Sequence, residues 1–298
     1  MATSPGLGPV VVGVNGSSTS DDAVDWASDF ASLTGRRLLA VHGTGFVGGP
    51  NAEDLLEAER VALEAGRLIA GAAVERAHRR HPDLVVAGVS DVGDPPSVLI
   101  EHGQEAALLV VGPRREEAFK RLFGSVSLSV TRHATCPVVV VRARDRQVPA
   151  AMSNHIVLGV DGTATSQDAA RFAFEYASLT DLPLVILFGS WERLSRGSSV
   201  MALLASGEER GLTEEEELTI AETVAGLPEE YPEVVVHEVH RSTDPAEALI
   251  TASETAQLVV VGARKMGAAR AMVLRSVSTA LVEHAHCPVA VVHAQTAR

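Results

Sequence analysis

Short runs of apolar residues alternate with longer amphipathic segments along most of the 298-residue chain. A short apolar run between turn-forming residues predicts a buried strand, whereas apolar residues recurring every three or four positions predict a helix. In the first half, strands are predicted at 10–14, 37–42, 84–89, 107–111 and 138–142. Helices are predicted between them, at 20–34, 52–80, 95–104 and 125–134.

The second half shows the same alternation. Its strands are predicted near 156–160, 184–189, 234–239, 258–261 and 289–293. Apolar strands separated by helices predict an α/β fold with a parallel sheet covered on both faces. Ligands of such sheets bind beyond the carboxyl ends of the strands, where the strand order reverses. The loops after the first and fourth strands of each half are therefore the candidate sites.

Three stretches of the first half return in the second half in the same order. They are VVVGVNGSST at 10–19 and IVLGVDGTAT at 156–165, LVVGPR at 109–114 and VVVGAR at 259–264, and GSVSLSVTRHATCPVVVVRA at 124–143 and RSVSTALVEHAHCPVAVVHA at 275–294. The offsets are 146, 150 and 151 residues. We therefore predict a first domain at 1–145, a linker at 146–154 and a second domain at 155–298.

Composition narrows the class of protein. The formal net charge of −13 argues against nucleic acid as a partner, because phosphate binding needs a positive surface. No apolar run approaches the length of a membrane span, and residues 1–9 do not resemble a signal peptide. The two cysteines form no CxxC pair, which favours a reduced, cytoplasmic setting.

The repeated unit resembles a universal stress protein domain, and the whole chain resembles a tandem universal stress protein of the actinobacterial kind. The resemblance rests on VVGVNGS and VLGVDGT after the first strands, VVG after the fourth strands, and GSVS…HATCPVVVV and RSVS…HAHCPVAVV at the ends. It implies two tandem Rossmann-like domains, each a five-stranded parallel sheet in the order 3-2-1-4-5. ATP-binding members carry G-x2-G-x9-G-[S/T] after the fourth strand and an Asp after the first, and other members bind no ATP.

The second copy carries most of this pattern but lacks two of its glycines. Gly262 and Ser276 match the first glycine and the Ser/Thr, the loop has the family's length, and Asp161 follows the first strand. Lys265 and Arg275 occupy the second and third glycine positions.

The first copy departs from the pattern differently. Gly112, Gly124 and Ser125 match, whereas Arg115 replaces the second glycine and Asn15 replaces the Asp. Its loop is also one residue short of the family's spacing. Neither copy therefore carries a complete motif.

The resemblance assigns residues to two candidate sites for ATP or a related adenine nucleotide. In the second copy these are Asp161, Gly162, Val261, Gly262, Lys265, Gly267, Arg275, Ser276 and Val277. In the first copy they are Asn15, Val41, Gly112, Arg115, Gly124, Ser125 and Val126.

Replacing glycine in a phosphate loop weakens binding, because glycine lets the backbone N–H groups approach the phosphate. Each lost hydrogen bond to a charged phosphate costs roughly 1.5–3 kcal/mol, and two cost roughly 3–6 kcal/mol. Against this loss, Arg264, Lys265, Arg270 and Arg275 offer positive side chains that can hold phosphates directly. The sequence leaves both outcomes open.

Simpler interpretations account for several of the same residues. Asn-Gly at 15–16 and Asp-Gly at 161–162 are common turn pairs. Cys136 and Cys287 precede a proline at the start of a last strand, which favours buried packing over redox chemistry. The acidic run at 208–218 predicts a solvated helix start, and His237 and His240 face opposite sides of a strand.

The sequence contains no nucleophile elbow, P-loop, metal-ligand spacing or paired carboxylates, so we expect that the protein is not an enzyme. Two functions remain. One is a ligand-regulated stress protein that binds ATP. The other is a nucleotide-independent scaffold of the stress response. In either case the apolar last strands, CPVVVV and CPVAVV, need covering. Because family members pair through this strand, we expect an internal pseudo-dimer, and further pairing of whole chains into a homodimer is compatible with it.

Restoring glycine at positions 265 and 275 is expected to raise ATP affinity at least about tenfold, or about 1.4 kcal/mol. The loop already has the right length, with Gly262 and Ser276 in place. Calorimetry on wild type and the Lys265→Gly/Arg275→Gly variant measures the change. Arg115→Gly is the control and should help little, because its loop stays one residue short. If wild type binds ATP more tightly than the double glycine variant, Lys265 and Arg275 are phosphate ligands rather than obstacles.

Overall fold

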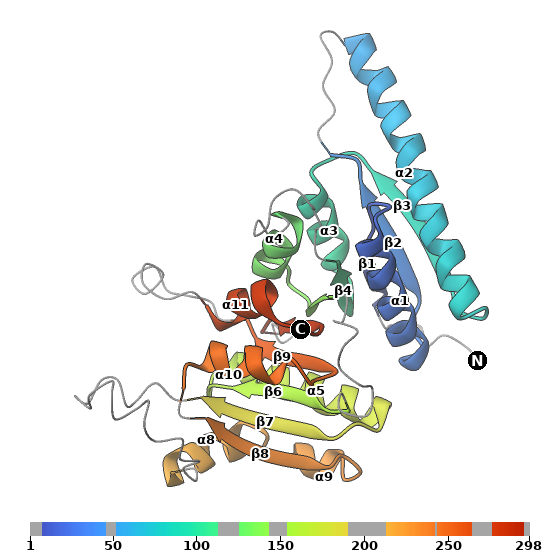
Figure 1. Cartoon of the computed structure of the whole chain (residues 1–298). Helices are drawn as coiled ribbons and strands as arrows, with labels where there is room; N and C mark the ends of the chain where they lie inside the picture. The colour runs from blue at the N-terminus through green and yellow to red at the C-terminus, as the bar shows by residue number, and fades with distance from the viewer. Residues whose placement is uncertain are drawn as a thin grey trace. The chain divides into compact units, whose positions relative to one another are not determined.

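The computed structural model describes residues 8–45, 52–112, 125–142, 154–189, 213–241, 243–263 and 276–294. The chain divides into two compact units, Met1–Ala143 and Arg144–Arg298. Each unit alternates strands and helices along the chain (Figure 1). The predicted linker at 146–154 lies outside the described residues except for its last residue.

The first unit has a parallel sheet in the order β3-β2-β1-β4-β5. Its strands are β1 (Val10–Gly13), β2 (Leu38–Gly43), β3 (Val86–Asp91), β4 (Leu108–Val111) and β5 (Val138–Val140). Its described helices are α1 (Ser18–Leu33), α2 (Ala52–Arg80), α3 (Pro95–Gly103) and α4 (Ser125–His133). Helix α1 packs with α2, and α3 packs with α4.

The second unit repeats this order as β8-β7-β6-β9-β10, again all parallel. Its strands are β6 (Ile156–Val160), β7 (Leu184–Gly189), β8 (Val236–Arg241), β9 (Leu258–Gly262) and β10 (Val289–Val292). Its described helices are α5 (Ala164–Thr180), α8 (Glu214–Thr223), α9 (Leu227–Glu230), α10 (Pro245–Ala252) and α11 (Val277–His284). The predicted fold class and strand order are confirmed.

Both units bury the apolar residues of their central strands. Val10, Leu109, Val157 and Val259 expose none of their surface. Burial of this kind requires cover on both faces of the sheet, which is why these strands read as continuous apolar runs.

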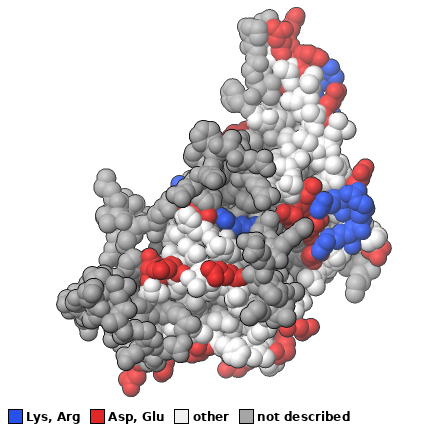
Figure 2. All heavy atoms as spheres, viewed as in Figure 1, with Lys and Arg blue, Asp and Glu red and all other residues white. Residues whose placement is uncertain are grey.

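An ion pair joins α2 to α1 on the outer side of the first unit, where Nε of Arg76 lies 2.6 Å from Oδ1 of Asp25. Basic side chains gather over this end of α2 (Figure 2). None of the described helices has the length and apolar character that crossing a membrane requires.

The third strand of each unit begins two residues later than its apolar run predicts. Strand β3 starts at Val86 rather than at 84, and β8 starts at Val236 rather than at 234. In both places a turn with proline in its second position comes first, closed by the N–H of Leu84 to the carbonyl of His81 and by that of Val234 to Tyr231. Leu84 and Val234, the first apolar residue of each run, therefore belong to the turns, and each strand begins two residues further on.

The glycine after the fourth strand has a packing role in both units. A Cβ on Gly112 would lie 2.4 Å from the carbonyl oxygen of Thr19, at the start of α1. A Cβ on Gly262 would lie 2.8 Å from the carbonyl carbon and oxygen of Thr165 in α5. Only glycine lets the helix backbone approach this closely, so the first glycine of the motif is needed for the fold whether or not a nucleotide binds.

Gly112→Ala is expected to destabilise the first unit by about 1–3 kcal/mol, because helix α1 must move away from β4. Gly71→Ala is the matched control in the same unit. No neighbouring atom lies within 4 Å of a Cβ there, and alanine in a helix gains roughly 0.5–1 kcal/mol over glycine. Urea unfolding of wild type and of both variants measures these changes in stability. A Gly112→Ala variant as stable as Gly71→Ala would refute the packing role.

Candidate functional site

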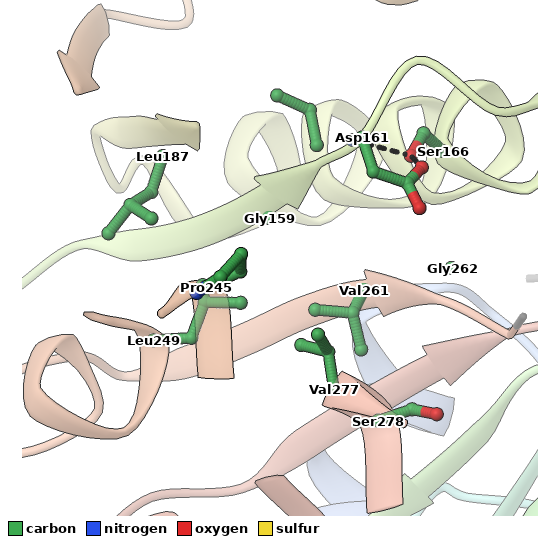
Figure 3. Close-up of a pocket in the computed structure, with 11 residues that line it drawn as sticks. Gly159, Asp161, Ser166, Leu187, Pro245, Leu249, Val261, Gly262, Val277 and Ser278 are labelled. Atoms are coloured by element: carbon green, nitrogen blue, oxygen red, sulfur yellow. Dashed lines mark hydrogen bonds between the residues drawn. The ribbon is translucent and has the colours of Figure 1, made fainter. Parts of the chain in front are cut away.

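A small cavity opens at the carboxyl ends of β6 and β9, where the strand order of the second unit reverses (Figure 3). This is the place that the α/β pattern predicts for a ligand. The cavity measures about 60 Å³, whereas pockets that enclose a drug-sized ligand measure roughly 300–1,000 Å³. Only part of a nucleotide would therefore fit inside it. The lining residues are Gly159, Val160, Asp161, Ser166, Leu187, Pro245, Leu249, Val261, Gly262, Val277 and Ser278.

The apolar side of the cavity is built around Gly159. A Cβ at this position would lie 2.9 Å from Cδ1 of Leu249 and 3.0 Å from Cγ1 of Val261. The two side chains therefore pack over the glycine, and Figure 3 shows Val261 on β9 and Leu249 on α10 beside it. In the first unit Gly13 stands in the same relation to Leu99, at 2.9 Å. Both units thus build the same apolar wall.

Asp161 directly follows β6 and holds the turn that leads into α5. Its Oδ1 accepts hydrogen bonds from the backbone N–H and the hydroxyl of Thr163, at 3.2 and 2.6 Å. The same oxygen accepts a hydrogen bond from the hydroxyl of Ser166 at 2.6 Å, and the Asp161 N–H donates to that hydroxyl. Gly162 completes the turn with a positive φ of 72°. One carboxylate oxygen therefore stabilises the helix start.

Asn15 has the matching place in the first unit with fewer bonds. Its Oδ1 accepts hydrogen bonds from the N–H and the hydroxyl of Ser17, at 3.0 and 2.7 Å. Ser17 in turn caps α1 through the N–H of Ser20. The hydroxyl of Ser20 donates to the Ser17 carbonyl, whereas Ser166 donates to the carboxylate. The predicted turns are confirmed in both units, and they use the residues that the nucleotide motif shares.

Ser276 caps the N-terminus of α11 beside the cavity. Its hydroxyl oxygen accepts a hydrogen bond from the N–H of Thr279 at 3.1 Å. Val277 and Ser278 follow it, and both line the cavity. The N–H groups of a helix's first residues have no carbonyl partner within the helix, and the helix dipole makes this end attractive to anions. The cavity therefore has a helix N-terminus on one side and the Asp161 carboxylate on another.

The structure brings four of the predicted site residues together, namely Asp161, Val261, Gly262 and Val277. Lys265, Gly267, Arg275, Arg115 and Gly124 lie outside the described residues, and of Ser125 only the backbone is described. Gly162 does not line the cavity, and Ser276 adjoins it as the cap of α11. In the first unit Val41 is buried in β2 and Val126 is half-buried in α4.

Sequence reasoning missed the residues that reach the cavity from other elements. They are Gly159, Val160, Ser166, Leu187, Pro245, Leu249 and Ser278. The sequence did contain a signal for one of them. Leu187 lies 146 residues after Val41, which is a predicted site residue of the first copy, so the repeat makes Leu187 its equivalent in the second copy. Pro245 and Leu249 of α10 do not belong to the nucleotide motif. They reach the cavity because α10 packs against the sheet.

The prediction of a solvated acidic helix start is wrong for Glu216, which is only 7% exposed. Its Oε2 accepts a hydrogen bond from the N–H of Thr213 at 2.8 Å, while Thr213 caps the helix in return. Its Oε1 lies 3.5 Å from Nε2 of His240 on β8. Residues 208–212 of the acidic run lie outside the described residues. Burial is favourable here because the capping bond and the imidazole together compensate for the lost hydration.

The first unit fills the same place with different side chains. Strand register pairs His42 with Ser90 in the first unit and Phe188 with His240 in the second. Opposite them on α2 stands Gly66, where a Cβ would lie 2.1 Å from the Ser90 hydroxyl oxygen. The first unit thus combines a large residue on the second strand with glycine on the helix. The second unit carries larger side chains at all three positions, with Phe188 and His240 on the strands and Glu216 on the helix.

The next turn of α8 reaches the turn at the cavity. Thr219 lies three residues after Glu216, and its Cγ2 would be 2.8 Å from a Cβ placed on Gly162. The buried Glu216–His240 pair therefore anchors a helix that packs against the residue after Asp161. His240 also stacks with Phe188, their ring centroids 6.4 Å apart. His237 on the same strand is exposed, as expected for the opposite face.

Within the described residues, no cluster of three His, Cys, Asp or Glu side chains is arranged to hold a metal ion. The two cysteines are buried, which confirms their predicted packing role. Burial raises the pKa of Cys136 to about 11, because the thiolate would lose its hydration.

Native Cys136 is expected to resist alkylation at pH 8, where a pKa of about 11 leaves about one thiol in a thousand ionised. A Cys287→Ala variant removes the other thiol, so labelling by iodoacetamide, followed by mass spectrometry, reports on Cys136 alone. The labelling rate should rise with pH up to about 11 and should rise sharply in urea. Complete labelling of the native protein within minutes at pH 8 would contradict this assignment.

Comparison with known proteins agrees with the repeat and the fold. The model of the universal stress protein family matches residues 7–142 and again 152–293. Universal stress protein Rv2005c of Mycobacterium tuberculosis is 33% identical over 288 residues, which cover 95% of this chain and 96% of the relative. Universal stress protein Rv1996 of the same organism is 35% identical over 305 residues, with 95% and 94% covered.

A solved structure supports the same fold over the whole chain. The crystal structure of a universal stress protein from Archaeoglobus fulgidus superimposes with a TM-score of 0.69 at 18% identity, covering 96% of this chain and 98% of that one. The strand order, the repeated unit and the two family matches agree. The chain therefore belongs to the universal stress protein family and contains two of its domains in tandem.

Proposed function

We propose that this tandem universal stress protein binds an adenine nucleotide in its second unit and acts as a ligand-regulated stress protein, without efficient turnover. The cavity at the ends of β6 and β9 would hold part of the nucleotide. The N-terminus of α11 would face the phosphates, and the Asp161 carboxylate would accept hydrogen bonds from ribose hydroxyls.

One observation carries the proposal. Asp161, Gly262, Val277 and Ser278 come from separate parts of the chain and line a single cavity where the strand order reverses. A carboxylate is a strong acceptor for sugar hydroxyls, and a helix N-terminus favours anions. Both groups suit a ligand that has a ribose and a phosphate, and the apolar wall of Leu249 and Val261 suits a base.

The second unit is favoured over the first because of its carboxylate. Asp161 has a negatively charged carboxylate with two acceptor oxygens, and its Oδ1 accepts hydrogen bonds from Thr163 and Ser166. Asn15 has one acceptor oxygen, which already serves Ser17, and its amide nitrogen can only donate. The first unit's motif loop is also one residue short.

A nucleotide-independent scaffold is the second candidate, and a specific observation favours it. Gly262 is required by its contact with Thr165, and Asp161 is required by the start of α5. Two of the matching motif residues thus have structural roles that explain them without a ligand. Under this candidate the cavity would remain as a consequence of the fold.

Release of bound nucleotide separates the two candidates. The protein is purified under native conditions and denatured, and the released small molecules are identified by mass spectrometry. The nucleotide proposal expects AMP, ADP or ATP in amounts approaching one per chain. Absence of nucleotide, together with no calorimetric binding of added ATP, would support the scaffold.

Asp161→Asn is expected to lower ATP affinity at least about tenfold while leaving stability within about 0.5 kcal/mol of wild type. A hydrogen bond to a charged group contributes roughly 1.5–3 kcal/mol, whereas the turn itself tolerates an amide, as Asn15 demonstrates. Asp161→Ala should lower both affinity and stability, the latter by about 1 kcal/mol, because the turn loses its acceptor.

Calorimetry with ATP and thermal unfolding of the same samples measure the two effects separately. Asn15→Ala is the matched control and should destabilise the first unit without changing affinity. An Asp161→Asn variant that binds ATP as tightly as wild type would rule out the carboxylate as a ligand group.

A further inference from the structure

A second and larger hollow lies in the second unit, between the edge strand β8 and the helices α8 and α9, and we call it the β8 groove. Its volume is about 620 Å³, within the range of roughly 300–1,000 Å³ of pockets for drug-sized ligands. It shares no lining residue with the cavity at the ends of β6 and β9. The lining residues are Phe174, Ile186, Val224, Pro228, Pro232, Val234, Val236, His237 and Glu238.

The groove opens where the helix beside the edge strand is interrupted. In the first unit this helix is α2, which runs without a break from Ala52 to Arg80. In the second unit α8 ends at Thr223 and α9 begins at Leu227, with Gly226 between them at a positive φ of 78°. Figure 1 shows one long helix in the first unit and two short ones in the second. Within the described residues, β8 therefore lacks the continuous helical cover that β3 has.

Larger side chains also hold the helix away from β8. In the first unit a Cβ on Gly88 would lie 3.2 Å from the backbone carbonyl of Ala70, so α2 rests directly on β3. By the repeat offsets of 146 and 150 residues, Ala40, Ala70 and Gly88 correspond to Ile186, Ile220 and Glu238. A glutamate has no room beneath a helix at that distance, and α8 packs mainly against α5. The space between helix and strand is the groove.

The carboxylate of Glu238 faces this space. Side chains alternate along a strand, so Glu238 lies on the same face of β8 as His240, which meets Glu216 of α8. Its neighbour on β7 is Ile186, which also lines the groove. Glu238 is exposed, and its side chain makes no hydrogen bond or ion pair with any residue that the structure describes. The groove thus has a carboxylate available to a ligand.

The surroundings of the groove are acidic. Residues 213–240 contain nine glutamates and no lysine or arginine. Exposed acids adjoin the lining residues at Glu222, Glu229 and Glu233. On α5, Arg171 is already paired with Glu230 at 2.9 Å. Among the described lining residues the basic side chain is that of His237, which belongs to the opposite face of β8. A field of this sign attracts cations and repels anions.

We propose that the β8 groove binds a small organic cation, namely an amine with an apolar body. The ammonium group donates hydrogen bonds to the Glu238 carboxylate, which are stronger than those between neutral groups. The apolar body lies against Val234, Val236 and the two prolines, above the buried Phe174 and Ile186. An apolar lining with one charged group that fixes orientation is the usual composition of a ligand pocket. This site is independent of the proposed nucleotide site.

Three probes that share an apolar body and differ in the head group test the proposal. They are phenylbutylamine, phenylbutanol and phenylbutyrate, titrated into the full-length protein and followed by protein NMR at low salt. The amine should bind with a Kd of about 0.1–1 mM, in keeping with its size. The alcohol should bind at least about fivefold more weakly, and the carboxylate should not bind. The affinity of the amine should fall as salt is added, because salt screens an exposed ion pair.

Glu238→Gln removes the charge and keeps the shape of the side chain. It should weaken binding of the amine at least about fivefold and leave binding of the alcohol unchanged. Glu222→Gln is the matched control, because Glu222 is exposed on α8 and does not line the groove. It should change the affinity of the amine less than about twofold. Thermal unfolding establishes that both variants keep the stability of wild type.

Several outcomes would overturn the proposal. They are absence of amine binding, equal affinity for the amine and the alcohol, and equal effects of the two substitutions. NMR shifts concentrated at the ends of β6 and β9 instead of at residues 224–238 would place the amine in the other cavity. Competition between the amine and ATP would also contradict a separate site. If a lysine-containing peptide binds along β8 while the free amine does not, the groove is a protein-docking surface.

Discussion

Close contact between a helix and the end of a strand governs the carboxyl edge of both sheets. Helix α1 approaches Gly112, and α5 approaches Gly262, at distances that leave no room for a Cβ. This approach places the start of the helix beside the fourth strand, so the turn that connects it to the first strand has little freedom. Asn15 and Asp161 hold that turn through hydrogen bonds to the next residues of the chain. The candidate site is a consequence of this packing, since its walls are the parts of the fold that the contact brings together.

The two units show which features of this arrangement can change. The glycines at the strand ends and the turn residues keep their roles, because backbone atoms make the contacts. Behind the turn, the first unit combines His42 and Ser90 with Gly66, and the second combines Phe188 and His240 with Glu216. The side chains are larger at all three positions in the second unit, so the two copies fill this space differently. The second unit therefore buries a contact between Glu216 and His240 where the first unit has Gly66 beside Ser90.

Structural and ligand roles overlap at Asp161, and this overlap limits what a motif match can mean. The carboxylate caps a turn that the fold needs, and Asp161 also lines the cavity where a nucleotide would lie. Because the turn needs an acceptor at position 161, Asp161 would be kept even in a protein that no longer binds nucleotide. Asn15 illustrates the minimal case, since it keeps the turn with an amide and no carboxylate. The function of the second unit depends on what reaches the cavity as a whole rather than on any single motif position.

The sequence by itself determined the repeat, the fold class and nearly all of the strands, because burial of β1, β4, β6 and β9 on both faces demands continuous apolar runs. It also located the turn residues and the motif glycines. Tertiary structure decided the rest. The strands β3 and β8 begin late because a proline turn takes their first apolar residue, and Glu216 is buried because His240 and Thr213 meet it from other segments. Leu187, Pro245 and Leu249 reach the cavity from strands and helices far apart in the chain. The pattern of apolar residues along a segment shows whether that segment is buried. It does not show which residues bury it, because those residues come from distant segments of the chain.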